Sequence, residues 1–331
     1  MIYSRMLRIL FLIPVLITTG CAPIKNMIPS NWGKEEGEVW CSNRYLDMNE
    51  YYQHPETSGA AFRKRLALSE KGYLYSLAAA YTLQSPKSDK YNFRLPSYMT
   101  KIDSLSRNDK SGFQAETFII INPSTGNKNV VVAFRGTDQF KDWYKHNAWL
   151  WPNQFEPARN YIKDVVAHPE SNGLDLIVSG YSLGGGLAVH VAQHPDTRGY
   201  VIEAWALNPS PRTGVPREED KRIYMLTAED EVLNILRRAS IGAPINQNAE
   251  DFDLLSSSSW YAHSRWVLTR QIMIYADLSL YIKSGRTAES TPPLDILKSK
   301  KFVGCRAEDE ARTEARRKKY RFVPRSVDTT I

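Results

Sequence analysis

The chain has little cysteine, and its N-terminal apolar run is too short to cross a membrane as a helix. Three cysteines among 331 residues exclude a disulfide-dense scaffold. The apolar run at residues 9–17 is far shorter than the roughly 20 residues that a membrane-spanning helix needs. Gly and Pro number 18 each, which argues against collagen-like and low-complexity chains. With 42% apolar residues, the chain is long enough to bury one large core.

Signatures of metal, nucleotide and nucleic-acid binding are also missing. The sequence shows no zinc-ligand spacing, no glycine-rich phosphate loop and no internal repeat. We therefore expect no cofactor. The formal net charge of +7 comes without a nucleic-acid motif. We expect no nucleic-acid partner, and the charge favours contact with an acidic membrane surface.

The first residues predict export. Arg5 and Arg8 flank the start of the apolar run, and small or polar residues lead from it to Cys21, which is the order of an export signal. The Gly20–Cys21 step resembles the lipobox of bacterial lipoproteins, in which the cysteine becomes the lipidated first residue. This resemblance implies an exported, periplasm-facing lipoprotein of the cell envelope that is anchored to a membrane surface. A simple signal peptide, which would give a secreted protein, and an uncleaved anchor are the alternatives.

The other two cysteines lie near opposite ends of the chain. If Cys21 carries lipid, Cys41 and Cys305 remain as one pair. In an oxidising compartment they are candidates for a disulfide between the two ends of the protein. Two unrelated buried thiols are the alternative.

Four segments are expected along the chain. Residues 1–21 are the signal peptide, and residues 22–58, which are polar and rich in Asn, Glu and Gly, are a linker. Residues 59–290 form one folded domain. Residues 291–331 are a charged C-terminal extension, either a solvated helix with a tail or an element that contacts lipid.

Within the folded domain, apolar strands alternate with helical patterns. Helices are expected at residues 60–83, 157–167, 183–193 and 265–282, and strands at residues 118–121, 130–134, 174–179, 200–207 and 223–227. The first two strands are expected to form a hairpin, and residues 86–112 a polar loop. Strands separated by helices predict the α/β class, with a mostly parallel central sheet and helices on both faces.

A Gly-Tyr-Ser-Leu-Gly sequence at residues 180–184 joins an apolar strand to a small-residue helix. A serine at such a tight turn has a strained backbone, and glycines two residues away on either side prevent collisions. The turn would expose the hydroxyl of Ser182 at a helix N-terminus, where the Leu183 N–H is one donor for an oxyanion. The pattern predicts Ser182 as a nucleophile, with a purely structural turn as the alternative.

His263 is the histidine that fits this nucleophile. Hydrolases with a nucleophile on such a turn present serine, acid and histidine in that order, so the histidines before Ser182 are excluded. His190 and His194 lie on the helix that leaves the serine, and His190 is about 12 Å away along its axis. His263 follows with room for an acid, although a lone surface histidine is the alternative.

The acid is expected directly after the strand at residues 223–227. We predict Asp230 there, which would hold the imidazole in the required tautomer. Glu229 is the nearest alternative, and Asp251 and Asp253 are more distant ones.

Several segments resemble the lipase class 3 family, which includes fungal-type triacylglycerol lipases and bacterial relatives. They are Ala-Phe-Arg-Gly-Thr at residues 133–137 with Asp-Trp at 142–143, Gly-Tyr-Ser-Leu-Gly-Gly at 180–185, and Asp-Glu-Val at 230–232. His263 falls where the family has its histidine. The resemblance covers residues 60–280 and implies an α/β-hydrolase fold for residues 59–290. Tyr181 stands where the family usually has His.

The resemblance also implies roles for neighbouring residues. Thr137 would be the second oxyanion-hole residue beside Leu183. Residues 143–157 would fall where the family has its lid, and the aromatic residues there either meet a lipid interface or pack in the core: Trp149, Trp151 and Phe155. Arg135 is expected to form a structural ion pair rather than to take part in catalysis.

These observations predict a serine ester hydrolase that acts on lipid esters, of the lipase or phospholipase A type. Ser182, His263 and Asp230 would form its triad. A carboxylesterase or acyltransferase on small esters and a catalytically silent envelope lipoprotein are the alternatives.

Overall fold

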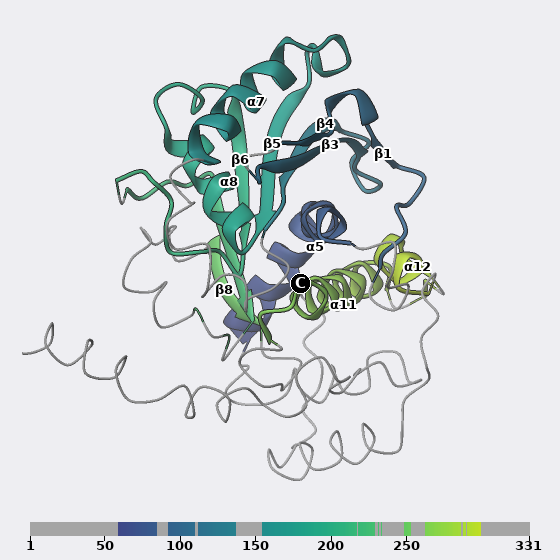
Figure 1. The fold of residues 1–331 in the computed structure, drawn as a ribbon. Coiled ribbons are helices and arrows are strands. Elements are labelled where there is room, and N and C mark those ends of the chain that lie inside the picture. The colour runs from purple at the N-terminus through teal and green to yellow at the C-terminus, as the bar shows by residue number, and fades with distance from the viewer. Residues whose placement is uncertain are drawn as a thin grey trace, which may run out of the picture. The chain divides into compact units, whose positions relative to one another are not determined.

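The structure is a computed structural model (Figure 1). It describes residues 59–84, 92–109, 112–136, 154–216, 218–228, 231, 233, 248–252, 262–285, 287–288 and 290–298. All of these lie in the larger of two units of the chain, Gly37–Ile331. Some predictions fall outside the described residues, namely the signal peptide, the linker, Cys21, Cys41, Thr137, Asp230 and Cys305.

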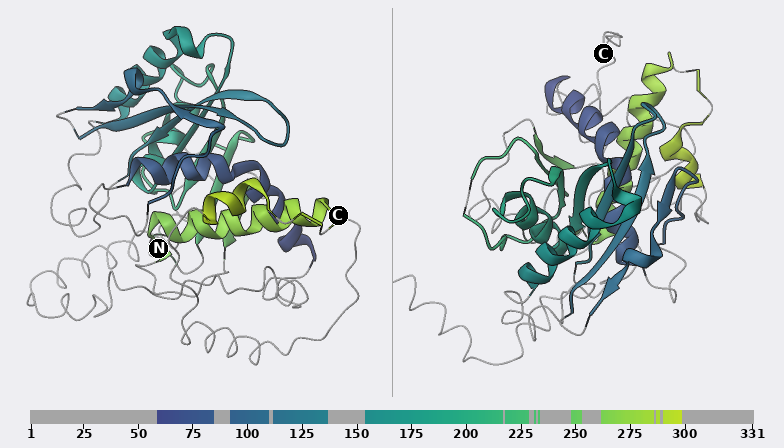
Figure 2. Two further views of the ribbon diagram at one scale, coloured as in Figure 1. Left: turned by 90° about the vertical axis from the view of Figure 1, so that its right-hand side faces the viewer. Right: turned by 90° about the horizontal axis from the view of Figure 1, so that it is seen from above.

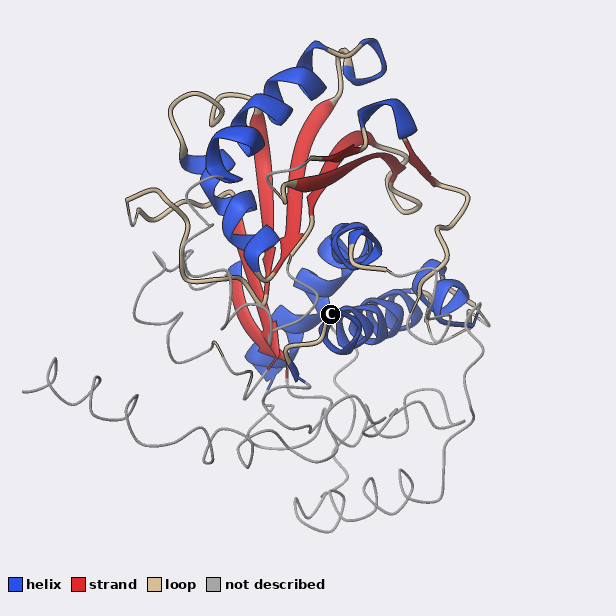
Figure 3. Cartoon of the chain, in the orientation of Figure 1, coloured by secondary structure: helices blue, strands red, loops and turns tan. Residues whose placement is uncertain are grey.

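The described strands form one eight-stranded sheet in the order β1-β3-β4-β5-β6-β7-β8, with β2 paired to β3. Their bounds are β1 Met99–Lys101, β2 Arg107–Asn108, β3 Gln114–Ile121, β4 Lys128–Phe134, β5 Asp175–Tyr181, β6 Val201–Leu207, β7 Ile223–Ala228 and β8 Ala249–Phe252. The pairs among β1 to β4 are antiparallel, and the pairs from β4 to β8 are parallel. The predicted α/β class with a mostly parallel sheet is confirmed (Figure 3).

Helices cover both faces of this sheet (Figures 1 and 2). On one face α5, Gly59–Thr82, lies against α11, Arg265–Lys283, and α12, Pro292–Lys298, packs on α11. On the other face α7, Phe155–Ala167, contacts α8, Leu183–Gln193. Two short 3-10 helices, Asp103–Leu105 and Pro169–Ser171, lie in connections.

The side-chain alternation of the strands explains why both faces are buried. In β4, Val130 and Val132 belong to the apolar cluster under α7 and α8, whereas Val131 and Ala133 belong to the cluster under α5 and α11. Successive residues of a strand point to opposite faces, so a strand covered on both sides must be apolar throughout. This is why the sequence shows a continuous apolar run there.

The β3–β4 hairpin is confirmed, with Phe118 opposite Val131. Asn122 begins its turn, where its side chain accepts hydrogen bonds from the backbone N–H groups of Ser124 and Thr125. The turn closes at Gly126, whose φ of +74° favours glycine.

Several elements differ from the prediction. Part of the polar segment at residues 86–112 forms the short strands β1 and β2, because the free edge of β3 offers backbone partners to residues without an apolar pattern. Strand β8 was not predicted either, since Ala-Glu-Asp-Phe has little apolar character, and it is defined by its pairing with β7. Leu294 and Leu297 of α12 are buried, so the packed domain extends beyond residue 290, where the charged extension was expected to begin.

Across the described residues, no helix is both long enough and apolar enough to span a membrane.

Candidate active site

Ser182 occupies a strained turn between β5 and α8. Its φ of +54° and ψ of −117° place a non-glycine residue in a region that costs about 1–3 kcal/mol. Three backbone hydrogen bonds hold this conformation. The Ser182 N–H donates to the carbonyl of Leu207 at 2.9 Å, and the Ser182 carbonyl accepts from the N–H groups of Gly186 and Ser210 at 3.2 and 2.8 Å. The predicted strand–serine–helix turn is present.

The glycines on either side of the turn have the expected steric role. A Cβ on Gly180 would lie 2.1 Å from the carbonyl oxygen of Gly184. A Cβ on Gly184 would lie 2.1 Å from the carbonyl oxygen of Phe134 on β4. Both contacts are with backbone, which a side-chain rotation cannot relieve, so the turn requires glycine at these two positions.

His263 lies against the serine hydroxyl. Its Nε2 is 3.0 Å from Ser182 Oγ, although the two residues are 81 positions apart in sequence. The histidine sits just before α11, whose N-cap is Ser264. Its side chain is 12% exposed, so water reaches it only at the edge. The structure thus brings together the two residues that the sequence predicted as nucleophile and base.

Among the described residues, the carboxylate hydrogen-bonded to His263 is that of Glu231, which the sequence analysis did not propose. His263 Nδ1 is hydrogen-bonded to Glu231 Oε1, and the Glu231 side chain is fully buried. Asp230 lies outside the described residues. Of the alternatives, Glu229 and Asp253 also lie outside them, and Asp251 accepts a hydrogen bond from the hydroxyl of Thr227.

The turn after β7 explains why Glu231 was missed. The Glu231 N–H donates to the carbonyl of Ala228 at 3.3 Å, and the Leu233 N–H donates to Glu231 Oε1 at 3.0 Å. These bonds fold the glutamate side chain back toward the sheet, where His263 meets it. Three carboxylates follow Ala228 in succession, and the sequence offers no periodicity that would have pointed to Glu231.

The start of α8 provides one donor for an oxyanion, the Leu183 N–H. Leu183 is the first residue of α8, so its N–H has no acceptor within the helix. Gly136, the last described residue before Thr137, packs tightly on the turn, and a Cβ there would lie 2.2 Å from the carbonyl oxygen of Tyr181. The residue before Thr137 is therefore adjacent to the nucleophile, while Thr137 itself lies outside the described residues.

His190, which the distance argument excluded as the base, makes structural contacts. Arg159 Nη1 lies 2.8 Å from its Nε2, and its Nδ1 lies 2.8 Å from the carbonyl oxygen of Thr213. Burial lowers its pKa to about 4, and the nearby Arg159 charge acts in the same direction. A neutral ring that donates from Nδ1 to Thr213 and accepts at Nε2 from Arg159 fits both contacts.

Two residues from the expected lid and oxyanion segments make structural contacts. Phe155 packs in the core, and Arg135 forms a hydrogen bond. Phe155 begins α7, stacks on the His190 ring with a centroid distance of 4.4 Å, and packs against the core. For this residue the core-packing alternative is the one observed; Trp149 and Trp151 lie outside the described residues. Arg135 Nη1 donates to the side-chain oxygen of Gln114 at 2.6 Å.

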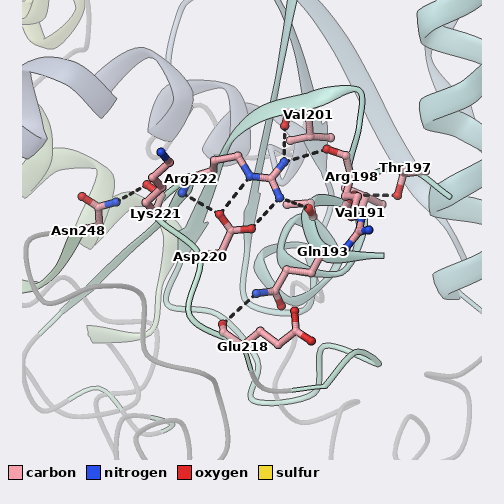
Figure 4. A network of polar contacts seen from close by, with 11 residues as sticks. Val191, Gln193, Thr197, Arg198, Val201, Glu218, Asp220, Lys221, Arg222 and Asn248 are labelled. Atoms are coloured by element: carbon pink, nitrogen blue, oxygen red, sulfur yellow. Dashed lines mark hydrogen bonds and ion pairs between the residues drawn. The ribbon is translucent and has the colours of Figure 1, made fainter. Parts of the chain in front are cut away.

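A second polar network lies at the other end of the sheet (Figure 4). Arg222 precedes β7, and its guanidinium donates to both carboxylate oxygens of Asp220 at 3.0 and 2.7 Å. It also donates to the carbonyl oxygens of Arg198, Val201 and Ala192, each at 2.8 Å. Burial alone would raise the pKa of Asp220, but the hydrogen bonds from Arg222 outweigh burial, and the pKa lies below its ordinary value. This network ties the start of β6 to the end of α8.

Comparison with protein-family models finds one match. The model described as a Tle-like phospholipase domain matches residues 70–222. This match includes Ser182 and ends before Glu231 and His263. Within the described residues, no group of three or more His, Cys, Asp or Glu side chains is arranged to hold a metal ion.

Solved structures with a similar fold include lipases and an esterase. A mono- and diacylglycerol lipase from Aspergillus oryzae is 18% identical, with 57% of this chain and 80% of that chain covered and a TM-score of 0.36. A fungal lipase is 16% identical, with 59% and 83% covered and a TM-score of 0.35. An esterase from Pyrobaculum calidifontis is 13% identical, with 75% and 100% covered and a TM-score of 0.36. No curated protein sequence matches the chain.

Proposed function

We propose that the chain is a lipase-like α/β-hydrolase and that it acts as a serine ester hydrolase of the lipase or phospholipase A type. The observation that carries the proposal is the 3.0 Å contact between His263 Nε2 and Ser182 Oγ at a strained strand-to-helix turn. In the proposed triad, Glu231 takes the place that the sequence analysis gave to Asp230.

The proposed reaction begins with proton transfer. Glu231 accepts a hydrogen bond from Nδ1–H of His263, which leaves the lone pair of Nε2 directed at the Ser182 hydroxyl. Ser182 Oγ forms a bond to the ester carbonyl carbon while its proton moves to Nε2. The carboxylate of Glu231 stabilises the imidazolium that results. Because Glu231 is fully buried, water competes little for this interaction.

Collapse of the tetrahedral intermediate completes the first half of the cycle. The carbonyl oxygen carries the negative charge, and the Leu183 N–H at the start of α8 donates to it, with Thr137 as the proposed second donor. The bond to the alcohol oxygen breaks, and that oxygen takes the proton from Nε2. Water then repeats the sequence on the acyl-enzyme, with His263 as its base, and releases the carboxylic acid.

Two features favour a lipid ester as substrate. The family model that matches residues 70–222 describes a phospholipase-like domain. The net charge of +7 favours binding to an anionic lipid surface. We further propose that the protein is exported and anchored at Cys21. Metabolic labelling with a fatty acid should mark the wild-type protein and not a Cys21→Ser variant.

The test compares wild-type protein with Ser182→Ala on three substrates: a short p-nitrophenyl ester, phosphatidylglycerol-containing vesicles and a triglyceride emulsion. We expect wild type to release fatty acid from a lipid substrate, and Ser182→Ala to lose at least about 10⁴-fold in kcat. A wild-type rate in the Ser182→Ala variant would contradict the proposal.

Further measurements separate the other functions. A fluorophosphonate probe should label wild-type protein at Ser182 and leave the Ser182→Ala variant unlabelled. Absence of labelling in folded wild-type protein would indicate a silent scaffold. Cleavage of the p-nitrophenyl ester alone would indicate a carboxylesterase. Acyl glycerol formed when glycerol is present would indicate an acyltransferase.

A further inference from the structure

Asn208 is the second strained residue at the carboxyl end of the sheet. It follows β6, next to the strand that ends at Ser182, and has a φ of +40°. Ser182 and Asn208 are the two non-glycine residues with positive φ in the described part of the chain. Asparagine tolerates this region better than most residues, although it still costs free energy. A strained residue beside a nucleophile is a reason to ask what its side chain does.

The Asn208 side chain connects three segments of the site. Its Nδ2 donates to the Tyr181 hydroxyl at 2.8 Å and to the carbonyl of Ala262 at 3.1 Å. Its Oδ1 accepts from the Ala228 N–H at 2.9 Å. Asn208 is fully buried, so water cannot replace these partners. One amide therefore joins the residue before the nucleophile, the residue before His263 and the end of the strand that leads to Glu231.

Tyr181 extends the connection to the other side of the histidine. Its hydroxyl donates to the carbonyl of Ser264 at 3.2 Å, and its ring meets the His263 ring edge-on at a centroid distance of 6.4 Å. Asn208 thus holds the carbonyl that precedes His263, and Tyr181 holds the carbonyl that follows it. Tyr181 is 1% exposed, so its hydroxyl also depends on protein partners.

We propose that Asn208 and Tyr181 act as a pair of positioning residues, the Asn208–Tyr181 clamp, which fixes His263 relative to both Ser182 and Glu231. The inference rests on the proposed function for its catalytic consequence. Neither residue touches the reacting atoms. The clamp acts by holding the backbone on both sides of the imidazole, so that Nε2 stays within reach of the hydroxyl while Nδ1 faces the carboxylate. Small displacements of such groups lower the rate strongly.

The clamp also explains two features of the sequence. Tyr181 stands where the lipase class 3 pattern has His, and its hydroxyl makes the contacts to Asn208 and Ser264. Asn208 shows no motif of its own, because its role depends on segments that lie 27 and 54 positions away in sequence.

The test uses Tyr181→Phe, which removes one oxygen and leaves the ring in place. Tyr161→Phe is the matched control, because Tyr161 is also buried in the core and its hydroxyl also bonds to a buried partner, Thr117, at 2.7 Å. We expect Tyr181→Phe to lower kcat about tenfold with KM changed less than about twofold, and to shift the midpoint of the pH profile of kcat/KM. Tyr161→Phe should keep the wild-type kcat and pH profile per folded molecule.

Asn208→Gly is a second variant that tests the clamp more severely. Glycine accepts the positive φ but makes none of the three side-chain contacts. We expect a loss of about 100-fold in kcat, and less-than-additive losses when it is combined with Tyr181→Phe. Wild-type kcat in folded Tyr181→Phe would overturn the clamp. If Asn208→Gly fails to fold, Tyr181→Phe alone decides.

A second readout does not depend on catalysis. The proton NMR resonance of His263 Nδ1–H reports its hydrogen bond to Glu231, and we expect Tyr181→Phe to shift it and Tyr161→Phe to leave it unchanged. Wild-type protein that cleaves no ester would contradict the proposed function, and this resonance would still decide whether the clamp holds His263. Active wild-type protein with an unshifted resonance and unchanged kcat in Tyr181→Phe would contradict the clamp and leave the proposed function standing.

Discussion

The two ends of the parallel sheet carry polar networks of opposite character. At the amino end of β7, Arg222 uses all five of its N–H donors, on Asp220 and on three backbone carbonyls. At the carboxyl end, Ser182 and Asn208 have positive φ, and the polar groups converge on a hydroxyl and an imidazole. The first network satisfies its groups without strain, whereas the second maintains strained conformations. We conclude that the Arg222 network stabilises the fold. The network at Ser182 costs some stability and holds the hydroxyl and the imidazole in place.

The largest effect is expected from the carboxylate at the carboxyl end. Glu231→Gln keeps the size of the side chain but removes the charge that stabilises the His263 imidazolium. We expect kcat for ester hydrolysis to fall about 10³–10⁴-fold, with little change in the melting temperature. The matched control is Asp230→Asn, which should retain the wild-type kcat to within about threefold. Steady-state kinetics on a p-nitrophenyl ester measures both, and the reverse ranking would restore Asp230 as the acid.

The amino end should show the opposite response. Arg222→Ala leaves the half-buried carboxylate of Asp220 and three carbonyl oxygens without their donor, so we expect the free energy of unfolding to fall by about 2–3 kcal/mol. The kcat per folded molecule should not change. Arg107→Ala is the control, because its ion pair with Asp164 is exposed and should contribute less than about 1 kcal/mol. Urea unfolding measures both values, and a large loss of kcat in Arg222→Ala would break the contrast between the two ends.

His190 makes the free energy of unfolding depend on pH, which gives a further test of a structural role. Its pKa is lowered to about 4 in the folded protein, against 6.5 for an ordinary histidine, so the unfolded chain binds the extra proton first as the pH falls. The contribution of the neutral ring is fully present above about pH 6.5 and is lost as the pH falls toward 4. Between pH 7 and 4.5, wild type should lose about 2 kcal/mol more unfolding free energy than His190→Gln. Equal losses in urea titrations at the two pH values would contradict this.

The smallest effect tests the strain at Ser182 itself. Glycine adopts a φ of +54° without a Cβ clash, so Ser182→Gly should be more stable than Ser182→Ala by about 1 kcal/mol. Both variants should be inactive. In helix α5 the order should reverse, with Ser76→Ala about 1 kcal/mol more stable than Ser76→Gly. Thermal unfolding of the four variants gives the comparison, and the same order at both sites would remove the argument for strain.

Much of the fold followed from local patterns. The bounds of α8 match the predicted helix at residues 183–193, and the hairpin, α5 and α11 were each predicted to within a few residues. A distinct turn marks the hairpin and the start of α8, and apolar residues recur at helical spacing along α5. Strand β8 and helix α12 lack such a signal, because one is defined by pairing with β7 and the other by packing on α11.

The sequence by itself determined the nucleophile turn and the histidine, since glycine spacing and chain order each restrict the choice to one residue. Only the tertiary structure revealed the contact between Glu231 and His263, because the hydrogen bonds of the turn after β7 orient the Glu231 side chain. It alone also revealed Asn208, whose three contacts come from segments far apart in the chain. Local sequence determines local conformation, but the orientation of a side chain in an irregular turn depends on partners that only folding brings near.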